Sequence, residues 1–533
     1  MNNILRRVPF HPFLWAVYPI LALLASNLGQ VYLWMAVRSL VLSLLATTVL
    51  FVLLWLIFRD WHKAALPVSL LVVMVFAYGH IYPSIEDATF LNFNIGRHRY
   101  LILVLVLLLA MLLVWLIRRP RNSLDSVTQA VNIIVLILVA IPLIQVIRYQ
   151  LTQVSAHQST SNTDRIASEM KGLSSLSLSE GKPAPDVYYI ILDAYGREDT
   201  LLEYFGYDNR AFLAHLEELG FFVARCSQSN YSVTEFSIAS ALNMEYLEQS
   251  DGTLGSTTDL EELISHSTVR QTLETLGYQS VAFESGYGLT EVRDADVYYS
   301  PNLRPGLANY LGGINAFEAL LLRTSIGFLI YERFDTLPDQ IKTMLNTAYA
   351  EHRTRILYTF DSIEQVSSEE GAKFVFAHIL APHNPFVFGA DGQLVVRSTP
   401  FTLNHDPESS DPVEYALGYT NQLTYINQRT GELIDHILAN APTPPIIILQ
   451  GDHGPMLRAT SAAARMTNLI AIYLPPGSTL EDQLYDSLTP VNIFRLILDG
   501  EFNTQLGLIK DISYFGSRST SADQFTIIPN DCR

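Results

Sequence analysis

The chain has 533 residues, of which 49% are hydrophobic, and its formal net charge is −18. Residues 1–150 carry 11 Lys and Arg against 4 Asp and Glu, a balance of +7, which leaves −25 for the remainder. The length suffices for a membrane region and a soluble domain of a few hundred residues. The acidic second part argues against nucleic-acid binding, which requires basic surface, and indicates a soluble, self-repelling surface.

Five apolar stretches in the first third are long enough to cross a bilayer of ~30 Å. They lie near residues 11–30, 38–58, 64–82, 100–117 and 128–147. For the first and the fifth an alternative stays open, because a cleaved signal peptide or an interfacial helix can imitate them. The second stretch follows the first immediately, which argues against cleavage.

Basic residues predict the orientation of these spans, because they concentrate in cytoplasmic loops. The loops assigned to the cytoplasm carry Arg6, Arg7, Arg59, Lys63, Arg118, Arg119 and Arg121, and the alternate loops carry Arg38, Arg97 and Arg99 beside Glu86 and Asp87. The N-terminus is therefore expected in the cytoplasm. An odd number of crossings then places everything after residue 150 on the outer side of the plasma (inner) membrane.

Two cysteines occur, Cys226 and Cys532. In an oxidising compartment they can form a disulfide that ties down the C-terminal segment, and two unpaired thiols are the alternative. This count excludes a cysteine-rich metal site.

Three domains are expected: residues 1–150 as the transmembrane region, 151–184 as a linker, and 185–533 as an extracytoplasmic domain. The linker is rich in Ser, Thr and Gln, with one weakly amphipathic stretch over 166–176 that predicts an interfacial helix.

Beyond residue 185, apolar strand patterns alternate with helical patterns. The strands are expected at Val187–Leu192, Ser280–Phe283, Phe374–Leu380, Ile446–Leu449 and Leu469–Leu474, and the helices include Asn209–Leu219, Thr268–Leu276, Leu345–Ser367 and Tyr415–Asn440. Such alternation predicts an α/β fold with a mostly parallel central sheet flanked by helices. Residues 286–340 and 388–412 lack either pattern and are expected to be long surface insertions.

Three of these strands lead to polar side chains that can bind a metal ion. Asp193 follows the first strand, His383 follows the third, and Asp452 and His453 follow the fourth. Ligands gather at the carboxyl ends of strands in open α/β sheets, so we expect these groups at one edge. Carboxylate and imidazole ligands suit Zn²⁺ or Mn²⁺. The alternatives are unrelated loop residues, and a tight turn whose Asp452 caps a helix.

Gly451 and Gly454 flank the Asp-His pair, and their small size is expected to let the backbone approach a bound anion.

A candidate nucleophile lies at Thr234, where a polar loop changes to helical periodicity. A hydroxyl at a helix N-terminus sits in positive partial charge, and a nearby cation lowers its pKa further. The alternatives are an ordinary N-cap role for Thr234 and Ser232 as the nucleophile. Ser237 and Ser240 are expected to be small core-facing residues.

The segment around the third strand carries two histidines. His383 in the strand-end loop can bind a phosphate oxygen or protonate a leaving alkoxide. A solvated loop position is its alternative, and His378, inside the strand, fits a hydrogen-bonded core histidine.

These motifs, in this order, resemble the alkaline phosphatase/sulfatase superfamily. They are Leu192-Asp193, the helix start at Thr234, the segment from His378 to His383-Asn-Pro-Phe386, and Gly451-Asp452-His453-Gly454. Because five predicted spans precede these motifs, the chain is similar in layout to the lipoteichoic acid synthase and phosphoethanolamine transferase branch. The resemblance to that branch covers roughly residues 185–500.

The resemblance implies one Zn²⁺ or Mn²⁺ surrounded by Asp193, Thr234, Asp452 and His453. It also implies that His383, and secondarily His378, bind the transferred phosphoryl group. Two positions depart from the branch, which commonly has Glu at the strand-end acid and a further histidine after the Asp-His pair. Arg465 stands in the latter region and is expected to contact the anion as a fixed cation.

The resemblance implies a transferase in which Thr234 takes a phosphoalcohol head group from a phospholipid and a cell-envelope glycan or lipid accepts it. A periplasmic hydrolase of phosphodiesters, phosphate esters or sulfate esters stays open as an alternative. So does a non-catalytic membrane pseudoenzyme. A true sulfatase is disfavoured, because Cys226-Ser-Gln-Ser-Asn lacks the Cys/Ser-x-Pro/Ala-x-Arg pattern that matures to formylglycine.

Overall fold

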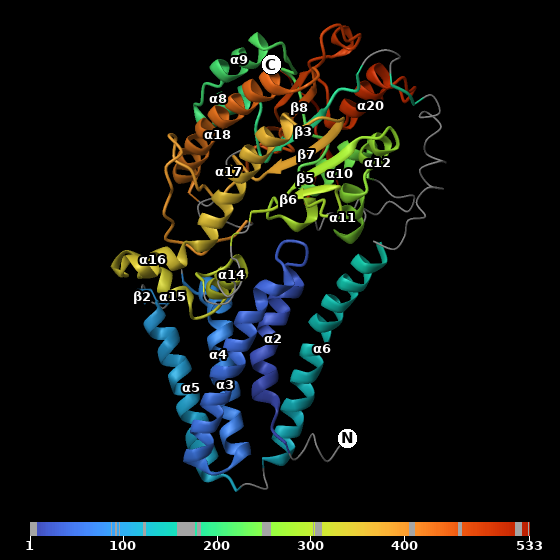
Figure 1. The fold of residues 1–533 in the computed structure, drawn as a ribbon. Coiled ribbons are helices and arrows are strands. Elements are labelled where there is room, and N and C mark those ends of the chain that lie inside the picture. The colour runs from blue at the N-terminus through green and yellow to red at the C-terminus, as the bar shows by residue number, and fades with distance from the viewer. Residues whose placement is uncertain are drawn as a thin grey trace. The chain divides into compact units, whose positions relative to one another are not determined.

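The computed structural model describes residues 8–86, 88–90, 93–94, 96–120, 124–156, 176–178, 183–247, 257–301, 303, 312–403, 411–456, 461–517, 525–530 and 532. The chain divides into two compact units. The helical unit comprises Met1–Thr152, Arg304–Ala348 and Arg397–Thr402, and the sheet unit comprises Gln153–Leu303, Tyr349–Val396 and Leu403–Arg533. Figure 1 shows the elements of both.

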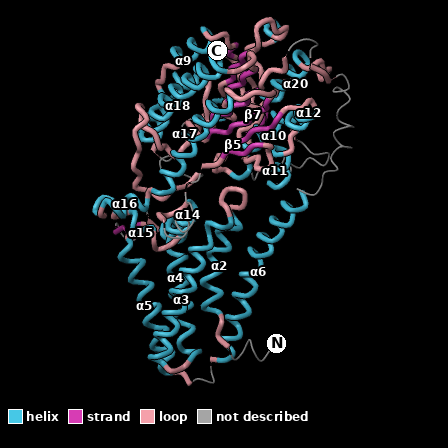
Figure 2. The backbone as a smooth tube through the Cα atoms, in the orientation of Figure 1, coloured by secondary structure: helices cyan, strands magenta, loops and turns pink. Residues whose placement is uncertain are grey.

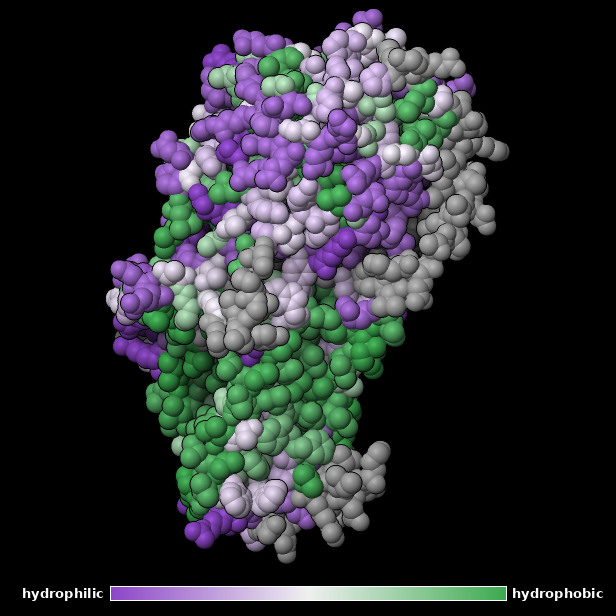
Figure 3. Space-filling model, viewed as in Figure 1, coloured by the Kyte–Doolittle hydropathy of each residue, from purple (hydrophilic) through white to green (hydrophobic). Residues whose placement is uncertain are grey.

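Apolar helices form the core of the helical unit. They are α2 (His11–Ser26), α3 (Val37–Phe58), α4 (Trp61–Ile81), α5 (His98–Arg118) and α6 (Asp125–Ala156). Among the described residues, four helices are long and apolar enough to cross a membrane, and α2, with 16 residues, is shorter. Hydrophobic residues cover the face of these helices that is visible in Figure 3. Helices therefore occupy all five predicted spans, and the orientation of the spans stays a prediction.

Residues 312–348 belong to the helical unit, although the sequence pattern predicted an irregular surface insertion over 286–340. They form α14 (Ala316–Thr324), α15 (Phe328–Tyr331) and α16 (Asp339–Leu345). Arg38 at the start of α3 forms an ion pair with Glu318 of α14, and Ile326 N–H donates to the Val75 carbonyl of α4 at 2.8 Å. The elements are too short for a clear periodicity, because their apolar residues pack against other helices instead of forming a long face. The predicted domain 185–533 thus includes a segment that clusters with the apolar helices.

The interfacial helix predicted over 166–176 lies almost wholly outside the described residues. Of the predicted linker, the structure describes 151–156 as the end of α6, and residues 176–178 and 183–184.

A seven-stranded sheet forms the centre of the sheet unit, in the order β4-β9-β8-β3-β7-β5-β6. Its strands are β3 (Val187–Leu192), β4 (Phe222–Val223), β5 (Gln279–Phe283), β6 (Val297–Tyr299), β7 (Lys373–Ile379), β8 (Ile446–Gln450) and β9 (Ile470–Tyr473). The central strand β3 pairs in parallel with β7 and β8, with Val187 opposite Phe374 and Ile446. Antiparallel pairing occurs where β9 joins β8 and β4 joins β9. The predicted fold class is therefore confirmed.

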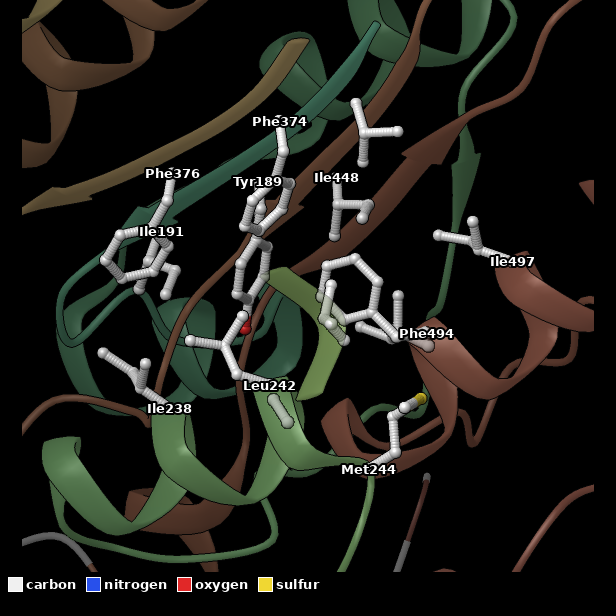
Figure 4. Close-up of a cluster of buried hydrophobic side chains, with 14 of the residues drawn as sticks. Tyr189, Ile191, Ile238, Leu242, Met244, Phe374, Phe376, Ile448, Phe494 and Ile497 are labelled. Carbon is white, nitrogen blue, oxygen red and sulfur yellow. The ribbon is translucent and has the colours of Figure 1, made fainter. Parts of the chain in front are cut away.

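Helices cover both faces of this sheet, which explains why its central strands are apolar throughout (Figures 1 and 2). On one face, Tyr189 and Phe374 pack with Phe494 of α20 (Pro490–Glu501) and Leu242 of α10 (Thr234–Asn243), as Figure 4 shows. Figures 1 and 2 place α17 (Thr347–Ser367) and α18 (Pro412–Asn440) on the other face.

The remaining elements of the sheet unit are short. They are the helices α8 (Glu198–Phe205), α9 (Arg210–Glu218), α11 (Thr257–Ser265), α12 (Thr268–Thr275) and α19 (Ala462–Met466), and the strand pair β10 (Tyr514–Phe515) and β11 (Thr526–Ile527).

Candidate active site

The carboxyl ends of β3 and β8 bring Asp193, Asp452 and His453 together. One ligand atom from each lies within 4.8 Å of the others, and all three side chains are buried. His453 Nε2 is 3.3 Å from Asp452 Oδ2 and 4.0 Å from Asp193 Oδ1. Asp193 is far in the sequence from the adjacent pair Asp452 and His453, and the pairing of parallel strands β3 and β8 places them at one edge.

The donor atoms of this cluster fit a divalent cation. Asp193 Oδ1 and Asp452 Oδ2 are buried and have no hydrogen-bond partner among the described residues. His453 Nδ1 donates to the Gly454 carbonyl at 3.1 Å, which leaves Nε2 as the acceptor nitrogen, and Arg465 Nη2 donates to it at 2.8 Å. Two carboxylate oxygens and one imidazole nitrogen are a donor set suited to Zn²⁺ or Mn²⁺.

The electrostatics of the cluster also favour a bound divalent cation. Burial and the neighbouring charge of Asp193 raise the pKa of Asp452 to about 7. Burial opposes ionisation of Asp193 as well, but the imidazoles of His383, His378 and His453 hold its pKa below the ordinary value. Burial, reinforced by the charge of Arg465, lowers the pKa of His453, so its imidazole is neutral and able to coordinate.

Thr234 is the first residue of α10 and is partly exposed. Its Oγ1 lies 3.1 Å from His453 Nε2, and no side-chain capping hydrogen bond is present at this helix N-terminus, where Val233 is the N-cap. The hydroxyl thus contacts the cluster and is not used as a helix cap.

The neighbouring hydroxyls have structural partners. Ser232 Oγ donates to the Gly516 carbonyl at 2.7 Å and accepts from Gly516 N–H at 3.0 Å. Ser237 Oγ donates to the Asp452 carbonyl at 2.7 Å, and Ser240 Oγ donates to the Glu245 carbonyl at 2.6 Å. Among Ser232, Thr234, Ser237 and Ser240, Thr234 is the residue whose hydroxyl contacts a side chain of the cluster, whereas Ser237 contacts only the backbone of Asp452.

The two candidate phosphate-binding histidines take different positions. His383 is partly exposed, donates through Nδ1 to the Asn384 carbonyl, and has its ring centroid 6.5 Å from that of His453. His378 is 3% exposed, with Nδ1 2.7 Å from Thr290 Oγ1 and Nε2 3.5 Å from Asp193 Oδ2. His383 therefore borders the site, whereas His378 is a core histidine that contacts Asp193.

Arg465 enters the site from α19. Its Nη2 is 2.8 Å from His453 Nε2, Nη1 donates to the Gly454 carbonyl at 2.6 Å, and Nε donates to the Ser232 carbonyl at 3.3 Å. The guanidinium is thus held beside the Asp-His pair, where its charge faces the cluster.

The glycines around the Asp-His pair allow backbone segments to pack closely. A Cβ at Gly451 would lie 2.3 Å from the Tyr195 carbonyl oxygen, and one at Gly454 would lie 2.4 Å from that of Ala464. Close packing of chain against chain therefore requires both glycines and fixes the turn that carries Asp452 and His453, and their approach to a bound anion stays a prediction.

Two residues near the site escaped the sequence interpretation. Ala194 has a left-handed backbone with φ of 61°, and its N–H donates to Asp452 Oδ1 at 2.9 Å. His352 of α17 is buried, and burial, followed by the charges of Arg355 and His383, lowers its pKa to about 3. An alanine has no polar side chain to signal its role, and His352 lies within an ordinary amphipathic helix pattern.

No protein-family model matches the chain, and no curated protein matches it. Solved structures do resemble it. They include the C-terminal periplasmic domain of EptC from Escherichia coli, with a TM-score of 0.41, 11% identity, and coverage of 66% of this chain and 95% of that one. A zinc complex of the same domain gives a TM-score of 0.41, 11% identity and coverage of 67% and 96%.

Lipooligosaccharide phosphoethanolamine transferase A from Neisseria meningitidis, an integral membrane protein, gives a TM-score of 0.38 and 13% identity, with coverage of 90% of this chain and 94% of that one. The lipoteichoic acid synthase LtaP from Listeria monocytogenes gives 0.37 and 11%, with coverage of 69% and 91%. The group that the motifs resemble thus also supplies solved structures that the chain resembles. These TM-scores lie below 0.5 and therefore carry no inference about function.

Proposed function

We propose that the protein is a membrane-anchored, metal-dependent phosphotransferase that moves a phosphoalcohol head group from a phospholipid to a glycan or lipid of the cell envelope. The observation that carries the proposal is the position of Thr234, whose hydroxyl oxygen lies 3.1 Å from His453 Nε2 at the first turn of α10. A hydroxyl beside a candidate cation site and at the positive end of a helix is suited to attack phosphorus.

Asp193, Asp452 and His453 would hold the divalent ion, Zn²⁺ or Mn²⁺. When bound, such an ion stabilises negative charge on a phosphoryl group and lowers the pKa of a nearby hydroxyl. The α10 N-terminus and the Arg465 guanidinium supply further positive charge for the phosphoryl oxygens, and His383 borders the same space.

The reaction proceeds in two displacements. Thr234 Oγ1 releases its proton to solvent and attacks the phosphorus of the donor phosphodiester, the bond from phosphorus to the diacylglycerol oxygen breaks, and that oxygen takes a proton for which His383 is the candidate donor. A hydroxyl of the acceptor then loses its proton, for which His383 is the candidate acceptor, and attacks the phosphothreonine ester. The bond from phosphorus to Thr234 Oγ1 breaks, and Thr234 Oγ1 takes back a proton from solvent. The apolar helices of the helical unit provide the membrane context that a phospholipid donor requires.

The covalent ester is the test of the proposal. The full-length protein, loaded with Zn²⁺ or Mn²⁺, is incubated with a phospholipid carrying an isotopically labelled head group, and mass spectrometry locates the label. We expect label on Thr234 in the wild type and in Thr234→Ser, and none in Thr234→Ala. Ser240→Ala is the matched control, because its hydroxyl binds the Glu245 carbonyl, and it should label normally.

Persistent labelling of Thr234→Ala would contradict the assigned nucleophile. Head-group release to water at the same rate with and without acceptor lipid or glycan would favour the hydrolase. Absence of both labelling and release across the phospholipids tested would favour the non-catalytic alternative.

A further inference from the structure

The loop that leads to Thr234, residues 226–233, has a two-sided anchorage that the reaction itself does not require. We propose that the described C-terminal residues, 511–517, 525–530 and 532, form a strap that positions this loop, and thereby the nucleophile. The function of the strap rests on the proposed role of Thr234.

Odd-numbered residues of the loop bond to the part of the sheet unit that carries the Asp-His pair. Ser227 Oγ donates to the Asn468 carbonyl, and Arg197 Nη1 donates to the Ser227 carbonyl at 2.9 Å. Ser229 N–H donates to the Met466 carbonyl at 2.7 Å, and Ser229 Oγ lies within 2.5 Å of the Asp452 carbonyl oxygen. This side of the loop is therefore fixed to the site.

The two even-numbered residues next to Thr234 bond to the strap through backbone and side chain. The Asn230 carbonyl accepts from Tyr514 N–H at 2.8 Å, and Asn230 Nδ2 donates to the Ile512 carbonyl at 3.0 Å. Ser232 Oγ makes its reciprocal pair with Gly516.

The even-numbered residues farther from Thr234 continue the pattern. Gln228 Oε1 accepts from Ser513 Oγ at 3.2 Å. The Cys226 carbonyl accepts from Asn530 Nδ2 at 2.7 Å, and a disulfide joins Cys226 to Cys532 with their Cα atoms 5.3 Å apart. Of the two arrangements that the sequence left open for the cysteines, the structure shows the disulfide.

A period of two is the geometry of an extended chain, whose successive residues face opposite sides. The loop thus lies between the site and the strap, much as an inner strand lies between two neighbours. Two contacts depart from this period: the ring of odd-numbered Tyr231 stacks on Tyr514 of the strap with centroids 5.5 Å apart, and the Ser232 carbonyl accepts from Arg465 Nε of the site at 3.3 Å. Among the described contacts of Asp193, Asp452 and His453, none involves the strap, so the strap acts on Thr234 and leaves the ion-binding residues in place.

Two strap variants of the full-length protein separate these functions. Ser232→Ala removes both bonds to Gly516, and Cys532→Ser opens the disulfide. We expect hydrogen exchange of amides 226–234 to accelerate about tenfold or more in each, Zn²⁺ content to stay at the wild-type level, and phosphothreonine formation to slow by a similar factor. Ser265→Ala, whose hydroxyl bonds within its own helix to the Glu261 carbonyl, is the matched control and should match the wild type in all three readouts.

Unchanged exchange in both variants would overturn the strap, as would loss of Zn²⁺ together with the faster exchange, because the latter would mean collapse of the whole site. Circular dichroism identifies a variant that fails to fold, and the other variant then decides. Because the exchange measurement does not depend on turnover, it tests the strap even if the wild type forms no phosphothreonine, an outcome that would defeat the proposed function alone.

Discussion

The backbone N–H of Ala194 donates a 2.9 Å hydrogen bond to Oδ1 of Asp452 and so ties the turn after β3 to the turn after β8. Ala194 adopts the left-handed conformation to do so, a conformation that costs a non-glycine residue about 1 kcal/mol. The bond satisfies one oxygen of Asp452 and leaves Oδ2 directed at His453 Nε2, 3.3 Å away. One backbone contact thus sets which carboxylate oxygen is available to a cation.

Asp452→Asn tests the candidate cation site. The amide oxygen keeps an acceptor for Ala194 N–H but removes the charge, so we expect Zn²⁺ affinity to fall at least about 100-fold with the fold intact. Equilibrium dialysis followed by metal analysis measures the affinity. Asp208→Asn, at an exposed position, is the control, and equal Zn²⁺ binding by both variants would remove the site.

Gly454→Ala tests the packing that fixes the Asp-His turn. The added Cβ at position 454 would lie 2.4 Å from the Ala464 carbonyl oxygen. One of the two backbone segments must therefore shift. We expect a loss of about 1–3 kcal/mol in the free energy of unfolding and weaker Zn²⁺ binding. Gly431→Ala in α18 meets only ordinary contacts, 3.6 Å from His215, and should stabilise the protein by up to about 1 kcal/mol. Equal stability of the two variants in chemical denaturation would contradict the packing argument.

His352→Gln tests how the buried His352 imidazole contributes to the pH dependence of stability. Burial, followed by the charge of Arg355, lowers the pKa of His352 from 6.5 to about 3. Between these values the unfolded chain holds the proton and the folded protein does not, so this residue's contribution to stability is lost as pH falls from 6.5 towards 3, by up to about 1.4 kcal/mol per pH unit. Glutamine cannot titrate, and the variant's Tm should fall less than the wild type's between pH 7 and pH 5.

Circular dichroism is the appropriate measurement for that titration. All five tryptophans lie at or before residue 115, so their fluorescence follows the helical unit. His436→Gln, at a partly exposed position in α18, serves as the control. Parallel declines of Tm in wild type and His352→Gln would show that His352 does not contribute.

Arg38→Met tests the attachment of residues 312–348 to the apolar helices. Arg38 donates to the carbonyls of Gly312 and Gly313 at 2.8 and 2.7 Å and pairs with Glu318, which would be left as a largely buried, unpaired charge. We expect the free energy of unfolding of the helical unit to fall by about 2–3 kcal/mol. The fluorescence of nearby Trp34 measures this unfolding. Arg99→Met, at an exposed position, is the control, and equal unfolding of the two variants would argue against a stabilising pair.

The sequence predicted β3, β7 and β8 to within a residue or two, because strands buried on both faces have continuous apolar runs bounded by polar residues. From those strands, the rule for carboxyl ends placed Asp193 near Asp452 and His453, and the change of pattern at Thr234 located the start of α10. These predictions depended on local signals that the tertiary structure did not override.

Other features had no local signal. The role of Ala194 depends on a backbone N–H, which every residue except proline has. Position 454 requires glycine because the Ala464 carbonyl oxygen lies close to it, a contact that arises only in the folded turn. The segment 312–348 forms helices of nine residues or fewer, whose apolar positions become regular only beside α4. The position of His378 inside a strand predicted a core histidine, but the sequence could not name its partners, Thr290 and Asp193.

The disulfide of the strap joins residues that are 306 positions apart, a ring that encloses most of the sheet unit. During synthesis, Asp193, Asp452 and His453 are all made before Cys532 emerges, so the ion-binding residues can assemble while the loop before Thr234 is still open. Covalent closure of that ring therefore cannot precede synthesis of the ion-binding residues, so the disulfide can secure the loop before Thr234 only after they are present.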